Sequence, residues 1–261
     1  MKDIQLHPDY RLIDLQRVGI KNLHLPLLIK QKKNGYQSVL ANVSLSVDLP
    51  RHYKGTHLSR FVEILEKWSQ KSLSSREIKD ILEEAAKKLS ARQAQITIKF
   101  KYFIKKKAPV SKQESFLDYG CEFTGIKDSD GYNFILGVEV PITALCPCSK
   151  EISRYGAHNQ RGYIRARVHC GGSIIWIEDL VSALEKQGSY PIFPLLKRAD
   201  EKFVTERAYE NPKFVEDVLR DAIGVLRKLP GIKWFEVECE NHESIHNHSA
   251  FAYQRESFTN F

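Results

Sequence analysis

The 261-residue chain lacks a long apolar run and a cysteine framework. No stretch approaches the roughly 18 to 20 consecutive apolar residues of a membrane span, and the segment from Met1 to Arg17 contains no signal-peptide core. The cysteines are five, an odd number, and two of them form a C-x-C pair too tight for an easy disulfide. These absences predict a soluble, cytoplasmic protein with reduced thiols and no membrane partner.

Three signatures of known chemistry are also missing. The chain has no G-x-x-x-x-G-K-[ST] phosphate loop, no second C-x-x-C knuckle and no local signature of a Ser-His-Asp triad. The first absence excludes a Walker-type nucleotide site. The second argues against a structural zinc site, because such sites usually draw four ligands from two short knuckles.

The charge balance does not single out nucleic acid as a partner. The formal net charge is +8 and the pI about 9.1, but basic residues are spread along the chain and mostly alternate with acidic ones. The densest lysine segment, Lys99 to Lys107, has the pattern of the exposed face and end of a strand. An anionic small substrate explains the surplus as well as a polynucleotide does, so we predict no nucleic-acid partner.

Hydrophobic periodicity in the first half predicts four strands and two helices. Apolar residues alternate with others over 23–29, 39–49, 94–102 and 117–123, and the first two of these segments flank a Lys33-Asn34-Gly35 hairpin turn. Helical spacing covers 58–68 and, after a Ser74-x-x-Glu77 capping box, 78–89. The order is ββααββ.

The second half repeats this order. Strand patterns cover 132–140, 164–170, 235–239 and about 248–253, and helices are expected at about 177–187 and 199–209. A third helix is predicted to have Asn211 as its N-cap and Pro212 at its first position.

The duplication predicts an α+β fold of two related modules, 1–126 and 127–261. Each module would be an antiparallel four-stranded sheet with helices on one face. Because the other sheet face and the edges would stay open, we expect the sheets to pair with those of partner subunits in a homo-oligomer.

A cysteine loop between two predicted strands is the first candidate site. Cys146, Cys148 and His158 place two thiols and an imidazole within thirteen residues, and Pro147 stiffens the loop between the thiols. Thiolate and neutral imidazole are preferred ligands of zinc and neighbouring divalent metals. A single cysteine is more often an inert small hydrophobic residue, but the combination favours an open catalytic metal site with mixed Cys, His and Glu ligands.

A polar segment near the C-terminal end is the second candidate site. Glu243 and His246 would converge on one ion if residues 241–247 form a tight strand connection, whereas His242 and His248 fit surface or supporting roles. Two other carboxylates sit in the first turns of predicted helices, where the helix dipole favours negative charge. By spacing alone Glu201 is a solvated side chain, while Glu216 can also accept paired N–H donors from a guanine or pterin edge.

Four motifs together resemble the type IB GTP cyclohydrolase I family, a resemblance that covers most of the chain and is densest from 131 to 253. The motifs are Leu145-Cys146-Pro147-Cys148-Ser149-Lys150-Glu151-Ile152, Gly156-Ala157-His158-Asn159-Gln160-Arg161, Leu195-Leu196-Lys197-Arg198 and Asn241-His242-Glu243-Ser244-Ile245-His246. One departure is Ala199, where the family usually has a proline; it concerns the rigidity of a loop. The resemblance implies tandem tunnelling-fold modules assembled as a homotetramer.

The resemblance also implies an activity and roles for the residues. Members convert GTP and water into formate and 7,8-dihydroneopterin triphosphate, the entry to folate and, in bacteria, to queuosine-type deazaguanines. By this likeness the metal ligands are Cys146, Glu201, Glu243 and His246, with Cys148 and His158 beside the reacting atoms and Glu216 anchoring guanine. The implied metal is divalent, zinc or manganese, and iron is compatible with the donors. The residues proposed to contact the triphosphate are Lys150, Arg161, Lys197, Arg198 and Arg207.

Two rival functions belong to other classes. A nitrile reductase of the queuosine route shares the tunnelling fold and uses a cysteine, but its chemistry is covalent and needs NADPH, whereas the pair Glu243 and His246 favours a metal. A zinc-stabilised nucleic-acid-binding protein is suggested by charge alone and would need a closed four-ligand site. An archaeal-type cyclohydrolase that yields a cyclic phosphate stays open on sequence alone.

Overall fold

The computed structural model describes residues 5, 7–171 and 174–258, which form two compact units. The first unit is built from residues up to 101 together with 122–135, and the second from 102–121 together with 136 onward. Three long strands therefore contribute residues to both units: β4 (Ala94–Lys107), β5 (Glu114–Asp128) and β6 (Gly131–Leu145). In the described part of the chain no helix combines the length and apolarity needed to cross a membrane.

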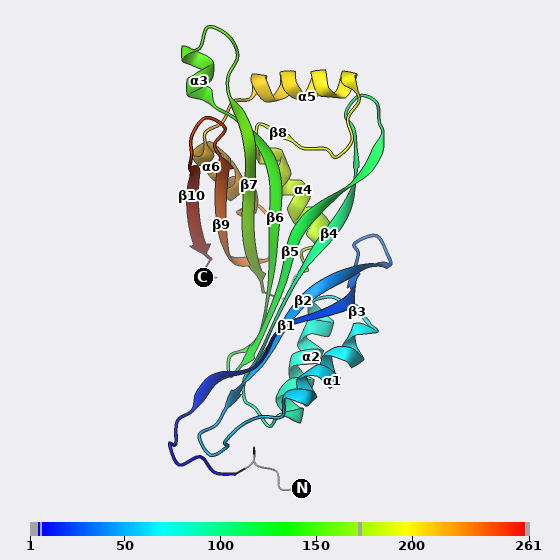
Figure 1. Ribbon diagram of the computed structural model, residues 1–261, viewed down its shortest axis with the longest axis vertical. Helices are drawn as coiled ribbons and strands as arrows, with labels where there is room; N and C mark the ends of the chain where they lie inside the picture. Colours follow the sequence, from blue (N-terminus) through cyan, green and yellow to red (C-terminus); the bar gives the residue numbers. More distant parts are fainter. Residues whose placement is uncertain (1–4, 6, 172–173, 259–261) are drawn as a thin grey trace. The chain divides into compact units, whose positions relative to one another are not determined.

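The first unit combines an antiparallel sheet with two helices. It contains β1 (Leu15–Lys30), β2 (Tyr36–Leu49), α1 (Leu58–Ser69), β3 (Ser72–Leu73) and α2 (Ser75–Lys88), as Figure 1 shows. The hydrogen-bonded order is β3-β1-β2-β4-β5-β6, and of the registers described here only that of the short β3 against β1 is parallel. Apolar side chains of both helices are buried. Helix α2 packs directly against β5 at Gly125, where there is no room for a Cβ beside the side chains of Ile78 and Leu82.

Local sequence accounts for these elements. Residues of β2 alternate between exposed or half-buried and buried, as a sheet with one covered face requires. The β1–β2 turn places Asn34 and Gly35 at φ 45° and 98°, a region that favours these two residue types. The Glu77 carboxylate accepts a hydrogen bond from the Ser74 backbone N–H at 2.9 Å, which confirms the predicted start of α2.

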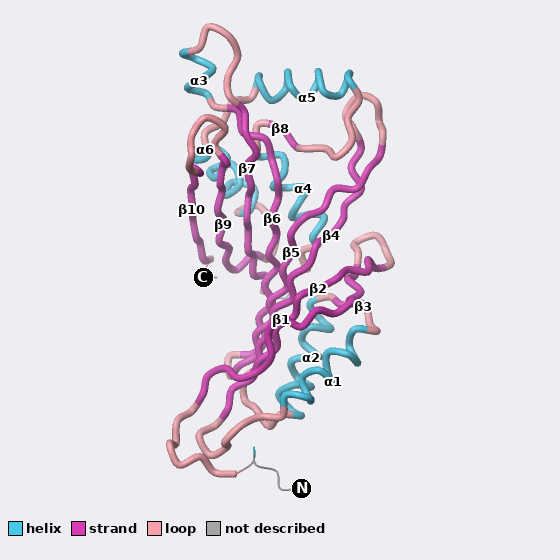
Figure 2. Tube along the Cα trace, in the orientation of Figure 1, coloured by secondary structure: helices cyan, strands magenta, loops and turns pink. Residues whose placement is uncertain are grey.

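The second unit contains the elements that follow β6, and its strands are part of the ten-stranded sheet that the described residues form. The order is β4-β5-β6-β7-β9-β10, with β8 paired to β6. Figure 2 shows the strands of this unit in magenta and its helices in cyan. The elements are α3 (Pro147–Ile152), β7 (Asn159–Cys170), α4 (Ile177–Leu184), the 3-10 turn η2 (Glu185–Gln187), β8 (Tyr190–Pro191), α5 (Arg198–Glu210), α6 (Val215–Leu226), β9 (Ile232–His242) and β10 (Ser249–Ser257).

One helix start was predicted wrongly. Helix α6 begins at Val215, with Phe214 as N-cap, and not at Asn211 and Pro212. The Asn211 amide instead donates to the carbonyls of Gly188 and Ser189 at 3.3 and 3.0 Å, so tertiary hydrogen bonds occupy the side chain that would have capped the helix. Asp217 takes over the capping role and accepts from the Phe214 backbone N–H at 3.1 Å.

The structure confirms the α+β class, with a large, mostly antiparallel sheet. The predicted hairpin turn at Lys33-Asn34-Gly35 is present, and so are the predicted helices of both halves, apart from the different start of α6. The module boundaries 1–126 and 127–261 stay a prediction, because the compact units group residues by contact and not by repeat. Residues 1–4, 6, 172–173 and 259–261 of the predicted modules lie outside the described residues.

Close packing between α2 and β5 makes a prediction for two glycines. A Cβ at Gly125 would lie 2.5 Å from Ile78 Cγ2 and 3.0 Å from Leu82 Cδ1, whereas a Cβ at Gly224 on α6 meets nothing within 4 Å. We expect Gly125→Ala to lower the free energy of unfolding by about 1 to 3 kcal/mol through overpacking. Gly224→Ala should raise it by up to about 1 kcal/mol, because alanine is the better helix former. Urea denaturation measures both, and equal stabilities of the two variants would contradict the packing argument.

Candidate active site

The cysteine loop follows β6 directly and is closed by local hydrogen bonds. Cys146 is the N-cap of the short helix α3, and its Sγ accepts from the Ser149 backbone N–H at 3.5 Å. Pro147 occupies the first helical position, where a missing N–H costs nothing. Ser149 Oγ donates to the Cys146 carbonyl at 3.2 Å. The thiol of Cys146 is therefore held in a defined position, while Cys148 is exposed and every cysteine is a free thiol.

His158 is fixed against this loop at the start of β7. Its carbonyl accepts from the Cys146 backbone N–H at 3.1 Å, and its own N–H donates to Ser149 Oγ at 3.2 Å. These two bonds join both ends of the loop 146–158. The backbones of Cys146 and His158 are therefore held on one small scaffold.

Glu243 reaches the same place from the end of β9. Strands β7 and β9 are antiparallel with Gly162 opposite Asn241, and just beyond this pair the side chains of Gln160 and Glu243 are in contact. Gln160 Oε1 lies 2.8 Å from His158 Nδ1, and Gln160 Nε2 donates to Glu243 Oε1 at 3.4 Å. The second Glu243 oxygen is 3.9 Å from His158 Nδ1. The side chains of His158 and Glu243 are only 14% and 12% exposed.

Close approach of the two strands supports this geometry. A Cβ at Gly162 would lie 2.6 Å from Asn241 Oδ1, so any larger residue there would push the buried Asn241 side chain away. Figure 1 shows that the end of β6, the start of β7, the β9–β10 connection, α3 and α5 all lie toward the same end of the second unit.

Helix α5 carries the predicted ligand Glu201 in an exposed position, next to a buried carboxylate that the sequence reasoning missed. Asp200 is fully buried and accepts backbone N–H bonds from Val110 at 2.7 Å, Ser111 at 2.8 Å and Lys197 at 2.9 Å. Burial opposes ionisation, but these donors outweigh it and hold the pKa of Asp200 far below its ordinary value of 3.8. The available signal was its position three residues after Lys197, where a capping carboxylate is expected.

His246 lies in the connection between β9 and β10 and is exposed. Its ring stacks on that of His248, with centroids 5.2 Å apart and planes inclined by 16°. Within the ranges that the structure describes, no three His, Cys, Asp or Glu side chains of one chain gather closely enough to hold a metal ion. The predicted ligand set of Cys146, Glu201, Glu243 and His246 therefore stays a prediction.

The residues predicted to bind substrate lie on the surface of the second unit. Lys150 Nζ donates to the Tyr209 carbonyl at 2.6 Å and lies 4.3 Å from the centroid of the Tyr209 ring, which ties α3 to α5. Arg207 forms an ion pair with Glu210 at 2.8 Å on the last turn of α5. The other residues of this predicted group are exposed, and within the described part of the chain their side chains have no comparable contact: Arg161, Lys197, Arg198 and Glu216.

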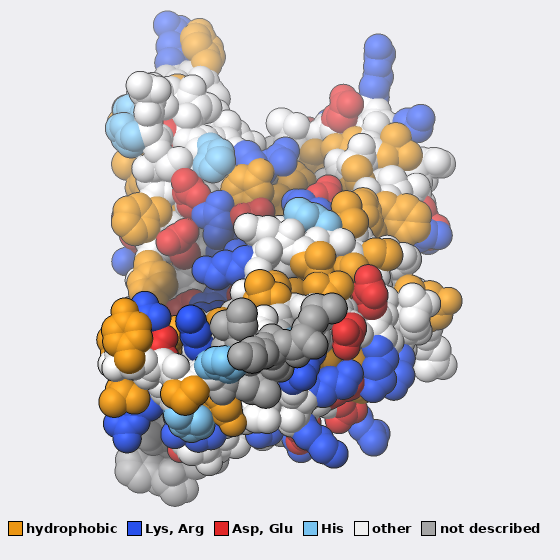
Figure 3. Space-filling model, turned by 60° about the horizontal axis from the view of Figure 1, so that its bottom comes forward, with side chains coloured by type: hydrophobic (Ala, Val, Ile, Leu, Met, Phe, Trp, Pro, Cys, Tyr) orange, Lys and Arg blue, Asp and Glu red, His pale blue; other side chains and the backbone are white. Residues whose placement is uncertain are grey.

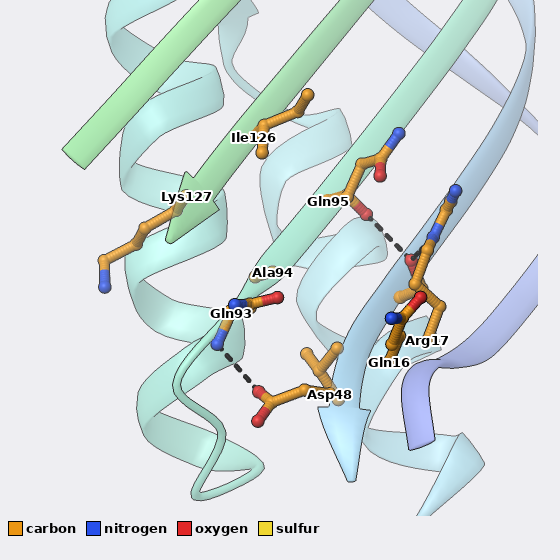
Figure 4. A pocket seen from close by; sticks show the side chains of 10 residues that line it. Gln16, Arg17, Asp48, Gln93, Ala94, Gln95, Ile126 and Lys127 are labelled. Carbon is orange, nitrogen blue, oxygen red and sulfur yellow. Dashed lines mark hydrogen bonds between the residues drawn. The ribbon is translucent and has the colours of Figure 1, made fainter. Parts of the chain in front are cut away.

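A separate, polar cavity belongs to the first unit. It has a volume of about 260 Å³, and its lining includes Gln16, Arg17 and Gln95. Figure 4 shows Asp48 at one side of it, where the carboxylate accepts from the Gln93 backbone N–H at 2.7 Å. None of the predicted site residues lines this cavity. On the face drawn in Figure 3, Lys and Arg side chains are interspersed with Asp and Glu.

Comparison with known proteins decides the family. A profile described as "Type I GTP cyclohydrolase folE2" matches residues 1–252. The chain belongs to the type I GTP cyclohydrolase FolE2 family. The GTP cyclohydrolase FolE2 of Geobacter sulfurreducens is 52% identical over 252 residues, covering 97% of this chain and 96% of the relative. That of Thermosipho africanus is 50% identical, with the same coverage of both chains.

Solved structures add a likeness of fold. The crystal structure of uricase from Arthrobacter globiformis matches with a TM-score of 0.57 over 93% of both chains, at 5% sequence identity. At this identity the match shows the fold alone. The resemblance drawn from the sequence motifs is confirmed at the level of the FolE2 family, whose members named above share the chain over nearly its full length.

The hydrogen bonds of Asp200 make a prediction about stability and pH. Asp200→Asn replaces one of the two carboxylate oxygens that accept from the backbone N–H groups of Val110, Ser111 and Lys197, and it should lower the midpoint of thermal unfolding by about 4 °C or more. Because the folded pKa is depressed, this contribution is present above pH 3.8 and is lost as the pH falls toward the folded pKa. The difference in unfolding midpoint between the variant and the unmodified protein should therefore be constant from neutral pH down to about 3.8 and become smaller at lower pH.

Glu206→Gln is the matched control, since Glu206 is an exposed carboxylate on the same helix. Thermal unfolding followed by circular dichroism at several pH values measures both variants. An Asp200→Asn midpoint equal to that of Glu206→Gln would contradict the assigned role.

Proposed function

We propose that this protein is a metal-dependent GTP cyclohydrolase I that converts GTP and water into formate and 7,8-dihydroneopterin triphosphate. Family membership makes it an enzyme of the GTP cyclohydrolase type, a hydrolase acting on GTP in folate biosynthesis. The observation that carries the proposal is the contact of His158, Gln160 and Glu243 beside the loop of Cys146, whose backbone N–H donates to His158, within a chain that matches the family over 252 residues. A further role in the queuosine route belongs to the same proposal.

The architecture proposed for the enzyme is a tandem tunnelling fold that assembles as a homotetramer through sheet pairing. The likeness to uricase over 93% of both chains supports the fold. Strand β10 ends the hydrogen-bonded order of its sheet, and Phe251 and Tyr253 on it are 69% and 51% exposed. An uncapped edge strand with exposed aromatic residues is suited to pairing with another sheet.

The donor chemistry of the site fits a divalent metal, although one chain does not gather three such donors among its described residues. The ligands we propose are Cys146, Glu201, Glu243 and His246, a thiol, two carboxylates and an imidazole, which suit zinc or manganese and are compatible with iron. When bound, such an ion supplies a water molecule of lowered pKa for hydrolysis.

The roles of the chain's own residues follow from their positions. His158 is half-buried beside the cysteine loop and is placed to give a proton to the guanine ring nitrogen as hydrolysis opens the ring at C8. Cys148 is exposed on the same loop and can meet the opened intermediate, from which a second hydrolysis releases formate. Glu216 would accept N–H bonds of the guanine edge.

The triphosphate has several negative charges, and the second unit offers several cations for them. Arg161, Lys197 and Arg198 are exposed, while Lys150 and Arg207 already have protein partners that a phosphate would have to replace or share. The residues proposed for triphosphate binding are therefore Lys150, Arg161, Lys197, Arg198 and Arg207.

Turnover of GTP by metal-defined protein tests the proposal. With manganese or zinc we expect formate and a pterin in a one-to-one ratio, and we expect both to disappear on chelation and in Cys146→Ala, because that variant removes the loop thiol. Formate is measured enzymatically and the pterin by fluorescence after oxidation, and chromatography of the product separates a triphosphate from a cyclic phosphate.

A second cysteine variant is the control for this test. Cys170→Ala removes a half-buried thiol on β7 that belongs to no part of the proposed site and should turn over normally. Absence of turnover with every divalent metal tried would refute the proposal, and NADPH consumption with a nitrile substrate would then favour a reductase.

A further inference from the structure

Gln160 is a polar side chain at a position where β7 otherwise presents small and apolar residues to the core. Buried residues alternate along this strand, and Gln160 begins the series that continues with Gly162 and Ile164. Gln160 is buried, with only 8% of its surface exposed. Burying an amide is costly unless its polar atoms are hydrogen bonded, so the partners of Gln160 indicate why glutamine stands there.

The partners fix the orientation of the amide group. Gln160 Nε2 is the amide atom that faces Glu243 Oε1, at 3.4 Å, and an amide NH2 donates while a carboxylate oxygen accepts. The amide oxygen is then left to face His158 Nδ1 at 2.8 Å. The reverse orientation would place an amide oxygen against a carboxylate oxygen and is electrostatically unfavourable.

This orientation in turn fixes the tautomer of His158. An amide oxygen is an acceptor, so Nδ1 must have a hydrogen to donate to it. In the neutral imidazole the other nitrogen, Nε2, then has the free lone pair.

We infer that Gln160 is a positioning residue for the reaction: it transmits the orientation of Glu243 to His158 and makes Nε2 the ring nitrogen that exchanges a proton with substrate. The inference rests on the proposed function for the identity of that substrate, a guanine ring, but the hydrogen-bond relay itself belongs to the free protein. It also couples the imidazole to a carboxylate of the proposed metal site, since both contact one amide.

The kinetics of one substitution test the relay. Gln160→Met keeps the shape of the side chain in a buried position but makes neither hydrogen bond, and it should lower kcat by about 10- to 100-fold. Because Gln160 is not proposed to contact GTP, KM should change less than about threefold.

Gln95→Met is the matched control, because it makes the same chemical change on β4 in the first unit, at the edge of the separate cavity. We expect it to keep the unmodified kcat. A kcat of Gln160→Met within about twofold of that of Gln95→Met would overturn the inference, since 10-fold is the smallest effect expected of such a support residue.

A spectroscopic measurement separates this inference from the proposed function. Nitrogen-15 NMR of histidine-labelled, metal-free protein at a pH where imidazole is neutral reports the tautomer, with His158→Gln identifying the signal. We expect the Nδ1–H form in the unmodified protein and a mixture in Gln160→Met. An Nε2–H form in the unmodified protein would overturn the inference whether or not GTP is hydrolysed, whereas the Nδ1–H form without any turnover would uphold the relay and refute only the proposed function.

Discussion

The antiparallel register between β7 and β9 is the constraint on which the candidate site depends. Gly162 opposite Asn241 brings together two segments about eighty residues apart in the sequence, and it places Gln160 and Glu243 face to face. A slip of one residue would turn every side chain of a strand to the other face of the sheet. The apolar core residues of both strands therefore specify the geometry of a polar site at their ends.

Buried polar groups at this end of the second unit show how such a site is kept in place. Gln160, Asp200 and Asn241 are each less than 9% exposed, and the first two are hydrogen bonded to segments distant in the sequence. Asp200 joins the start of α5 to the β4–β5 connection, while Gln160 joins β7 to the end of β9. Since unsatisfied buried polar groups are costly, each residue disfavours alternative arrangements of the chain around the site.

The sequence predicted the secondary-structure elements better than the tertiary contacts between them. Alternation and helical spacing depend on which face of an element is buried, so strands such as β2 and helices such as α2 could be found from their own residues. The start of α6 could not, because Asn211 is engaged by carbonyls more than twenty residues away. The motif around Cys146 was recognised directly, but the roles of Gln160 and Asp200 follow only from partners on other strands and loops.

The discontinuous make-up of the two units has a consequence for synthesis on the ribosome. The first unit needs residues 122–135 for its sheet, yet the chain first supplies 102–121, which belong to the second unit. At ordinary elongation rates the missing strand segments arrive on the order of seconds after the rest of the first unit. During that interval β2 and the beginning of β4 have formed only part of their sheet, and the helices α1 and α2 cover an incomplete core. A nascent chain of this kind exposes apolar surface for longer than one whose domains follow each other in sequence.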